Sequence, residues 1–198
     1  MSAIVGLRAA VLAVLVLVLG CGLFEPRPPR PGGGGAVNCL VPNSPDLVMS
    51  NVRHQYGSLQ GVTCYSSMID TGFVFHPDAS DSIQALPDTV YAHWTRDIET
   101  RVATGLASEA KFDSTVIDSE YASPVISPDQ RTQTRFFVYR LVARAPQAAP
   151  DTVFSGLADI TFFQGGDAQW HITNWVDKRD ASGARTWGYL RSRYRVGF

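Results

Sequence analysis

Much that marks an enzyme is missing from this sequence. The chain has no glycine-rich phosphate-binding loop, because the four glycines at 32–35 follow no strand, and it has no Gly-x-Ser-x-Gly nucleophile motif. Its four histidines, His54, His76, His93 and His171, show no metal-ligand spacing. We therefore expect no metal and no cofactor, and the sequence assigns no catalytic residue.

Charge is also scarce. Charged residues make up 18% of the chain, and the formal net charge is −1. Removal of the first twenty residues takes away Arg8 and leaves a net charge of −2. This balance argues against nucleic acid or an anionic surface as the partner.

No apolar run is long enough to cross a bilayer as a helix. The uncharged run Ala9–Gly20 follows Arg8. A membrane span needs about 20 apolar residues, whereas the apolar part of a secretory signal needs roughly 7 to 15. Residues 1–20 are therefore predicted to be a signal peptide.

The end of that run suggests a lipid anchor. Val18-Leu19-Gly20-Cys21 resembles the bacterial lipobox, although the usual pattern has a small residue where Leu19 stands. The resemblance implies that Cys21 is acylated and becomes the first residue of the mature protein. The alternative is a buried apolar hairpin with a core cysteine. The Pro/Arg and glycine segment that follows argues against it, because such a linker separates the run from any core.

Residues 21–43 then form a lipidated tether. Gly22 stands where, by resemblance to enteric lipoproteins, an aspartate retains proteins at the inner membrane. We therefore expect a cell-envelope protein held on the outer membrane and facing the periplasm. In that oxidising space Cys39 and Cys64 either form a disulfide or remain free, with Cys64 buried on a helix face.

Residues 44–198 have the length of a single domain. Hydrophobic residues make up 45% of the whole chain, which is enough to form a core. Helical spacing predicts helices over 44–60 and 62–69, with a break at Gly61, and a third helix capped by Thr95. A short strand, 73–75, and a loop, 78–89, lie between them. Period-two alternation then predicts strands over 112–122, 132–145, 152–163, 169–177 and 190–196.

This order predicts an α+β domain with an antiparallel sheet covered on one face by about three N-terminal helices. The alternating Arg191, Arg193 and Arg195 either engage anionic lipid or a partner, or form the solvated face of an edge strand, and we expect the second.

The same order, with Phe73-Val74-Phe75 and the motif Trp170-x-Ile172-x-x-Trp175-x-Asp177, resembles the nuclear transport factor 2-like fold. SnoaL-like polyketide cyclases and ketosteroid isomerases share it. The resemblance implies a cone-shaped, strongly curved sheet. It favours a bulge near Thr173 or Asn174, which brings the motif's tryptophans and isoleucine to one side.

The resemblance also implies a pocket inside the cone. Its candidate ligand-binding residues are Tyr65, Trp94, Tyr139 and Trp175. We expect the Tyr139 hydroxyl to find a core acceptor rather than a ligand, and Asp177 to cap a turn rather than act as a base. His171 could be a general base, but alternation points it towards solvent.

We therefore expect a non-catalytic binding domain for a small apolar ligand or an envelope protein. The alternative is a SnoaL-like enzyme that catalyses proton transfer or hydrolysis, and a third possibility is a structural part of an envelope assembly. By resemblance, a homodimer is also plausible. No nucleic acid partner is expected.

Overall fold

The computed structural model describes residues 39–54, 59–84, 90–109, 112–143 and 152–195. These belong to one compact unit, Val37–Phe198. The predicted signal peptide, Cys21 and most of the predicted tether lie outside the described residues. Within the described ranges no helix is both long enough and apolar enough to cross a bilayer.

Four helices come early in the described chain: α2 (Pro45–His54), α3 (Leu59–Ser67), α4 (Ala79–Gln84) and α5 (Arg96–Glu109). Ser44 caps α2 as predicted, because its Oγ accepts the N–H of Leu47 at 3.4 Å and Pro45 takes the first helical position. The predicted break at Gly61 is wrong. Gly61 is buried inside α3, where tertiary packing outweighs its poor helix propensity.

The predicted loop over 78–89 is also partly wrong, because α4 lies within it. Asp78 caps this short helix, since its Oδ1 accepts the N–H of Ser80 at 2.9 Å. Asp78, one of the residues that suggested a loop, therefore serves as a helix cap here. Residues 85–89 lie outside the described residues.

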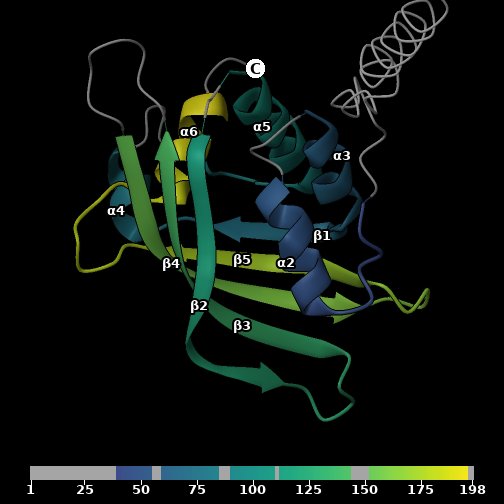
Figure 1. Cartoon of the computed structure of the whole chain (residues 1–198). Helices are drawn as coiled ribbons and strands as arrows, with labels where there is room; N and C mark the ends of the chain where they lie inside the picture. The colour runs from purple at the N-terminus through teal and green to yellow at the C-terminus, as the bar shows by residue number, and fades with distance from the viewer. Residues whose placement is uncertain (1–38, 55–58, 85–89, 110–111, 144–151, 196–198) are drawn as a thin grey trace, which may run out of the picture. The chain divides into compact units, whose positions relative to one another are not determined.

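Five strands form one sheet in the order β1-β5-β4-β3-β2. They are β1 (Ile69–His76), β2 (Phe112–Ile126), β3 (Thr132–Ala143), β4 (Thr152–Gln164) and β5 (Trp170–Lys178). The prediction of a wholly antiparallel sheet is wrong at β1, which pairs parallel with β5. A parallel pair needs a long crossover, and the chain between β1 and β5 supplies one. The sheet is mixed and curves around α2, α3 and α5 (Figure 1).

The concave face of the sheet holds the core. On β3, Phe137, Tyr139 and Leu141 are buried, as alternation predicted. On β5, Thr161 pairs with Asn174 whereas Phe162 pairs with Ile172, so Thr173 is an extra residue in the strand. The predicted bulge is therefore confirmed, and it places both Ile172 and Trp175 in the core.

The largest error of the sequence analysis is at the C-terminal end. Residues 190–196 were predicted as a strand, but the chain forms a helix, α6 (Trp187–Arg195). Thr186 caps it by accepting the N–H of Tyr189 on Oγ1 at 3.1 Å. Because the residues are helical, the three arginines do not share a face, and Arg191 points inward with 1% of its surface exposed.

Candidate functional site

The four candidate ligand-binding residues all lie in the interior. The exposed fraction is 0% for Tyr65, 4% for Trp94, 1% for Tyr139 and 0% for Trp175. They come from α3, the segment before α5, β3 and β5. Each packs against other side chains of one core cluster. The structure therefore gathers them on the concave side but does not leave them exposed to a ligand.

Glu99 of α5 is the centre of the first polar group in this interior, which we call the Glu99 cluster: Tyr65, Trp94, Glu99 and Arg191. The hydroxyl of Tyr65 donates to Glu99 Oε1 at 2.6 Å, and the indole N–H of Trp94 donates to Oε2 at 2.8 Å. Arg191 Nε donates to Oε1 at 3.1 Å. Both Glu99 and Arg191 are 1% exposed, so this is a buried ion pair held by further hydrogen bonds.

The guanidinium of Arg191 is surrounded by aromatic rings. Its carbon lies 4.3 Å from the ring centre of Trp175, 4.6 Å from that of Phe75 and 4.9 Å from that of Trp187. Rings at these distances stabilise a cation through their quadrupoles, most strongly where water is excluded. Arg191 and Trp187, both from α6, therefore fill the space between the candidate ligand residues.

Asp177 of β5 is the centre of the second polar group, the Asp177 cluster: Tyr139, Asp177, Trp187 and Gly188. The hydroxyl of Tyr139 donates to Asp177 Oδ1 at 2.7 Å and accepts the N–H of Trp187 at 2.8 Å. Asp177 Oδ2 accepts the N–H of Gly188. The carboxylate thus lies at the N-terminus of α6, where the helix dipole favours a negative charge.

Of the two predictions made for this cluster, the one for Tyr139 is confirmed and the one for Asp177 is correct only in that it caps a backbone segment. The Tyr139 hydroxyl has a core acceptor, and Asp177 binds the backbone of the segment that follows β5. Asp177 caps the start of a helix, however, and not a turn into a strand.

Burial sets the ionisation of these groups. It raises the pKa of Asp177 to about 6, although the hydrogen bond from Tyr139 and the charge of Arg191 act in the opposite direction. Burial and the charge of Glu99 raise the pKa of Tyr65 well above its usual value. Burial and the charge of Asp177 do the same for the pKa of Tyr139. Both tyrosines are therefore neutral hydrogen-bond donors at physiological pH.

A third set of contacts fastens the start of α6 to α4. Thr186 donates its hydroxyl to Asp81, and Arg179 Nη2 donates to the same carboxylate at 2.9 Å. Asp81 is 1% exposed. The backbone N–H of Arg179 also donates to Asp78 Oδ2 at 2.9 Å. These hydrogen bonds attach both ends of the segment 179–186, which precedes α6, to Asp78 and to Asp81 of α4.

Two glycines allow the close packing around Tyr139 and Asp177. A Cβ on Gly156 would lie 2.4 Å from the Tyr139 hydroxyl and 2.5 Å from the carbonyl oxygen of Lys178. A Cβ on Gly188 would lie 2.9 Å from Asp177 Oδ2. Contacts this short force neighbouring atoms to move.

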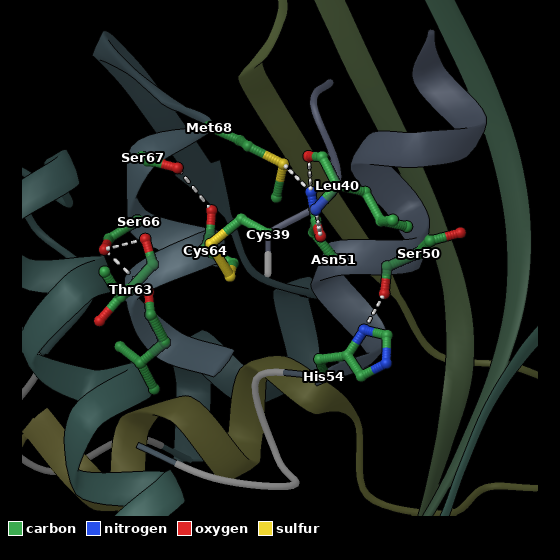
Figure 2. The surroundings of a disulfide bond; sticks show 11 residues. Cys39, Leu40, Ser50, Asn51, His54, Thr63, Cys64, Ser66, Ser67 and Met68 are labelled. Atoms are coloured by element: carbon green, nitrogen blue, oxygen red, sulfur yellow. Dashed lines mark hydrogen bonds between the residues drawn. A yellow bond between two sulfur atoms is a disulfide. The ribbon is translucent and has the colours of Figure 1, made fainter. Parts of the chain in front are cut away.

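The start of the domain is held by a disulfide. Of the two alternatives for the cysteines, the structure has Cys39 bonded to Cys64 of α3, with Cα atoms 5.2 Å apart (Figure 2). Asn51 of α2 binds the next residue on both backbone groups: its Oδ1 accepts the N–H of Leu40 at 3.0 Å, and its Nδ2 donates to the carbonyl of Leu40 at 2.7 Å. The disulfide closes a separation of 25 residues and ties the chain to the helical layer.

The histidines do not enter this interior. His76 and His93 are exposed, and the ring of His171 lies on the other side of the sheet from Ile172, 3.7 Å from Asp167. Among the described residues no group of His, Cys, Asp and Glu side chains is arranged to hold a metal ion.

Sequence reasoning missed Glu99 and Arg191. Both carry a helical signal. Glu99 precedes Val102 by three residues and Leu106 by seven, and Arg191 lies four residues after Trp187. Each charged residue thus falls on the apolar stripe of its own helix and faces the core. A buried charge needs a partner of opposite sign, so this pattern indicates a buried ion pair.

Comparison with known proteins shows the fold alone. No family model matches the chain, and no curated protein matches it. Among solved structures, a protein of unknown function from Mycobacterium tuberculosis matches with a TM-score of 0.52 at 11% identity, over 76% of this chain and 83% of that one. A putative scytalone dehydratase from Novosphingobium aromaticivorans matches with a TM-score of 0.51 at 13% identity, over 72% and 90%.

An NTF2-like protein of unknown function in nutrient uptake from Rhodospirillum rubrum is matched over 98% of its own length and 69% of this chain, with 9% identity and a TM-score of 0.46. The domain has the NTF2-like fold that the resemblance implied: a curved sheet, here mixed, wraps around helices. A fold does not by itself fix an activity.

Proposed function

We propose that this chain is a lipid-anchored envelope protein whose NTF2-like domain is a non-catalytic binding module for a protein partner. The observation that carries the proposal is the closed interior. All four candidate ligand residues are buried, and α6 places Arg191 and Trp187 between them. Because these side chains are buried among the described residues, the partner is expected on the outer surface.

The outer surface offers a place for a partner. Six consecutive residues of β2, Tyr121 to Ile126, are exposed, and none of them is charged. Val125 is 62% exposed and Ile126 55%. β2 is an edge strand of the sheet. Exposed apolar residues on an edge strand favour contact with another polypeptide.

The test combines mass spectrometry with cross-linking. Native mass spectrometry of the chain isolated from membranes reports acyl groups on Cys21, any retained small molecule and the oligomeric state. A photo-reactive residue at Val125 should capture a protein in the envelope. The same residue at Val74, which is 44% exposed on β1, serves as the control. An unmodified Cys21, or equal capture at both positions, would refute the proposal.

One observation favours the enzyme alternative. Asp177 has a pKa of about 6 and lies 2.7 Å from the Tyr139 hydroxyl, which is a base beside a proton donor. In addition, the indole N–H of Trp175 has no hydrogen-bond acceptor among the described residues. Proton transfer would require access to Asp177. Hydrogen exchange at the Gly188 amide tests this, because a closed site exchanges only on global unfolding.

A further inference from the structure

One face of the domain concentrates arginine, although the predicted mature chain has a net negative charge. Two depressions lie side by side on α5 and share Arg101. A cavity of about 140 Å³ is lined by Ile98, Arg101, Val102 and Arg195. A more open depression is lined by Ser66, Arg96, Asp97, Thr100 and Arg101. Three of these residues are cationic and one is anionic.

The arginines are held in place by the backbone. Arg195 Nη2 donates to the carbonyl of Ala92 at 2.9 Å, and its guanidinium lies 5.2 Å from the ring centre of Trp94. Arg96 Nη2 donates to the carbonyl of Ser66 at 3.3 Å. Neither Arg96 nor Arg195 forms an ion pair with another residue of the described ranges. Their guanidinium groups donate to backbone carbonyls, and no carboxylate of the described ranges neutralises them.

The neighbouring charges affect one another. Burial lowers the pKa of Arg195, and the like charge of Arg101 lowers it further. Asp97 is the acidic residue in the lining, and the other carboxylate of this part of α5, Glu99, is buried against Arg191. An anion that bound between the arginines would relieve their mutual repulsion.

This face lies beside the point where the predicted tether is fastened. The disulfide joins Cys39 to Cys64, in the last turn of α3, and the same turn provides the Ser66 carbonyl that Arg96 binds. Only residues 22–38 separate Cys21 from Cys39. A chain of that length reaches at most about 60 Å when fully extended, so an acylated Cys21 would keep Cys39 within that distance of the lipid surface.

We propose that Arg96, Arg101 and Arg195 bind the phosphate groups of phospholipid headgroups in the membrane that holds the chain. The inference rests on the lipid anchor proposed above. Guanidinium groups bind phosphate oxygens through paired hydrogen bonds, and the apolar floor of Ile98 and Val102 suits the carbon atoms next to a headgroup phosphate. From the net charge of −2 we expected no anionic surface as partner. A net charge is a sum over the whole chain, however, and does not show that these three arginines lie close together.

The test uses the full chain, purified from membranes and reconstituted in vesicles of phosphatidylcholine alone or mixed with phosphatidylglycerol. A fluorescent label on Thr104→Cys, an exposed position one turn after Thr100, reports proximity to lipids that carry a nitroxide on the headgroup. The same label on Val125→Cys is the control. The label at Thr104 should be quenched more strongly than the label at Val125, and more so with phosphatidylglycerol present.

Substitution and salt sharpen the test. Each arginine near an anionic surface contributes a factor of about five to binding, so Arg96→Gln with Arg101→Gln should lower the equilibrium constant for docking about 30-fold. Arg140→Gln, an exposed arginine on β3, should leave quenching unchanged. Salt at about 1 M shortens the screening length to about 3 Å and should abolish the difference between the two labels.

Two results would overturn the inference. They are equal quenching of both labels, and quenching at Thr104 that is the same with and without phosphatidylglycerol. The mass of the protein in the same sample shows whether Cys21 is acylated, and this distinguishes failure of the anchor from failure of the arginine face. An acylated Cys21 with equal quenching rejects the arginine face alone, whereas an unmodified Cys21 rejects the anchor and this inference together.

Discussion

Two carboxylates in the core, Glu99 and Asp177, are equally buried at 1% exposure and differ in their partners. Glu99 binds a guanidinium, a tyrosine and a tryptophan. Asp177 binds a tyrosine hydroxyl and a backbone N–H. A guanidinium is paired with the first carboxylate, whereas hydrogen-bonding dipoles contact the second. Burial raises the pKa of Asp177 to about 6, against the effect of these hydrogen bonds and of the charge of Arg191.

Both arrangements depend on α6. The helix directs Arg191 to the Glu99 cluster and its own N-terminus to the Asp177 cluster. The same short helix thus provides a side-chain charge for Glu99 and a backbone N–H for Asp177. Substitutions at Arg191 and at Asp177 test these two contributions separately.

Replacement of Arg191 by alanine should have the largest effect. Removal of one partner of a buried ion pair leaves Glu99 charged and uncompensated, so the free energy of unfolding should fall by about 3–5 kcal/mol. Urea unfolding followed by tryptophan fluorescence measures it. Arg193→Ala, on the exposed side of the same helix, should change stability by less than about 0.5 kcal/mol.

The double variant Glu99→Leu with Arg191→Met sharpens this result. It removes both charges and should lose much less stability than Arg191→Ala, because no charge is left buried without a partner. A loss equal to that of Arg191→Ala would mean that packing, and not charge, dominates the Glu99 cluster.

Removal of the disulfide should come next. Cys39→Ala with Cys64→Ala frees a 25-residue loop in the unfolded chain, and the chain-entropy relation gives a loss of about 3.5 kcal/mol. Because Cys64 neighbours Tyr65 in α3, NMR signals of Tyr65 should shift more than those of Tyr139. A reductant should destabilise the native chain and leave the variant unchanged. Insensitivity of the native chain would contradict the bond.

The pH dependence tests the Asp177 cluster. The pKa of Asp177 is about 6 in the folded protein and 3.8 ordinarily, so the folded state binds the proton more tightly. The stability that this proton provides is complete below pH 3.8 and is lost as the pH rises through about 6, a total of about 3 kcal/mol.

Urea unfolding between pH 4 and 7 measures this effect in the native chain and in Asp177→Asn. Asparagine carries no charge, so the stability of the native chain relative to the variant should fall across this range. Parallel stability curves would show that the carboxylate does not titrate there.

The smallest effect is expected at Gly188, whose lack of a side chain lets Asp177 approach the N-terminus of α6. Gly188→Ala places a Cβ 2.9 Å from Asp177 Oδ2 and 3.3 Å from Phe75 Cζ, which should cost about 2 kcal/mol. Gly166→Ala is the matched control, because a Cβ there meets nothing within 4 Å. Thermal unfolding compares the two variants, and equal melting temperatures would contradict the packing around Asp177.

The elements that sequence reasoning located correctly have strong periodicity or clear caps. α5 and the four long strands belong to this group. The bulge at Thr173 was expected from the resemblance and not from alternation, and the pairing of β4 with β5 confirms it. The four candidate ligand residues were placed on the concave side by resemblance, and they do lie there. What occupies the space between them was missed, because an alternation of arginine as short as 191–195 fits a strand as well as a short helix.

Local sequence patterns are enough to locate the apolar stripes, the starts of α2 and α5, and the residues of β3 that face inward. Period and capping are local properties, so no distant contact is needed to set them. The parallel pairing of β1 with β5, the bond between Cys39 and Cys64, and the contact of Arg191 with Glu99 follow from the tertiary structure. These contacts join segments far apart in the chain, and the free energy gained by burying them together outweighs the local preference for a strand.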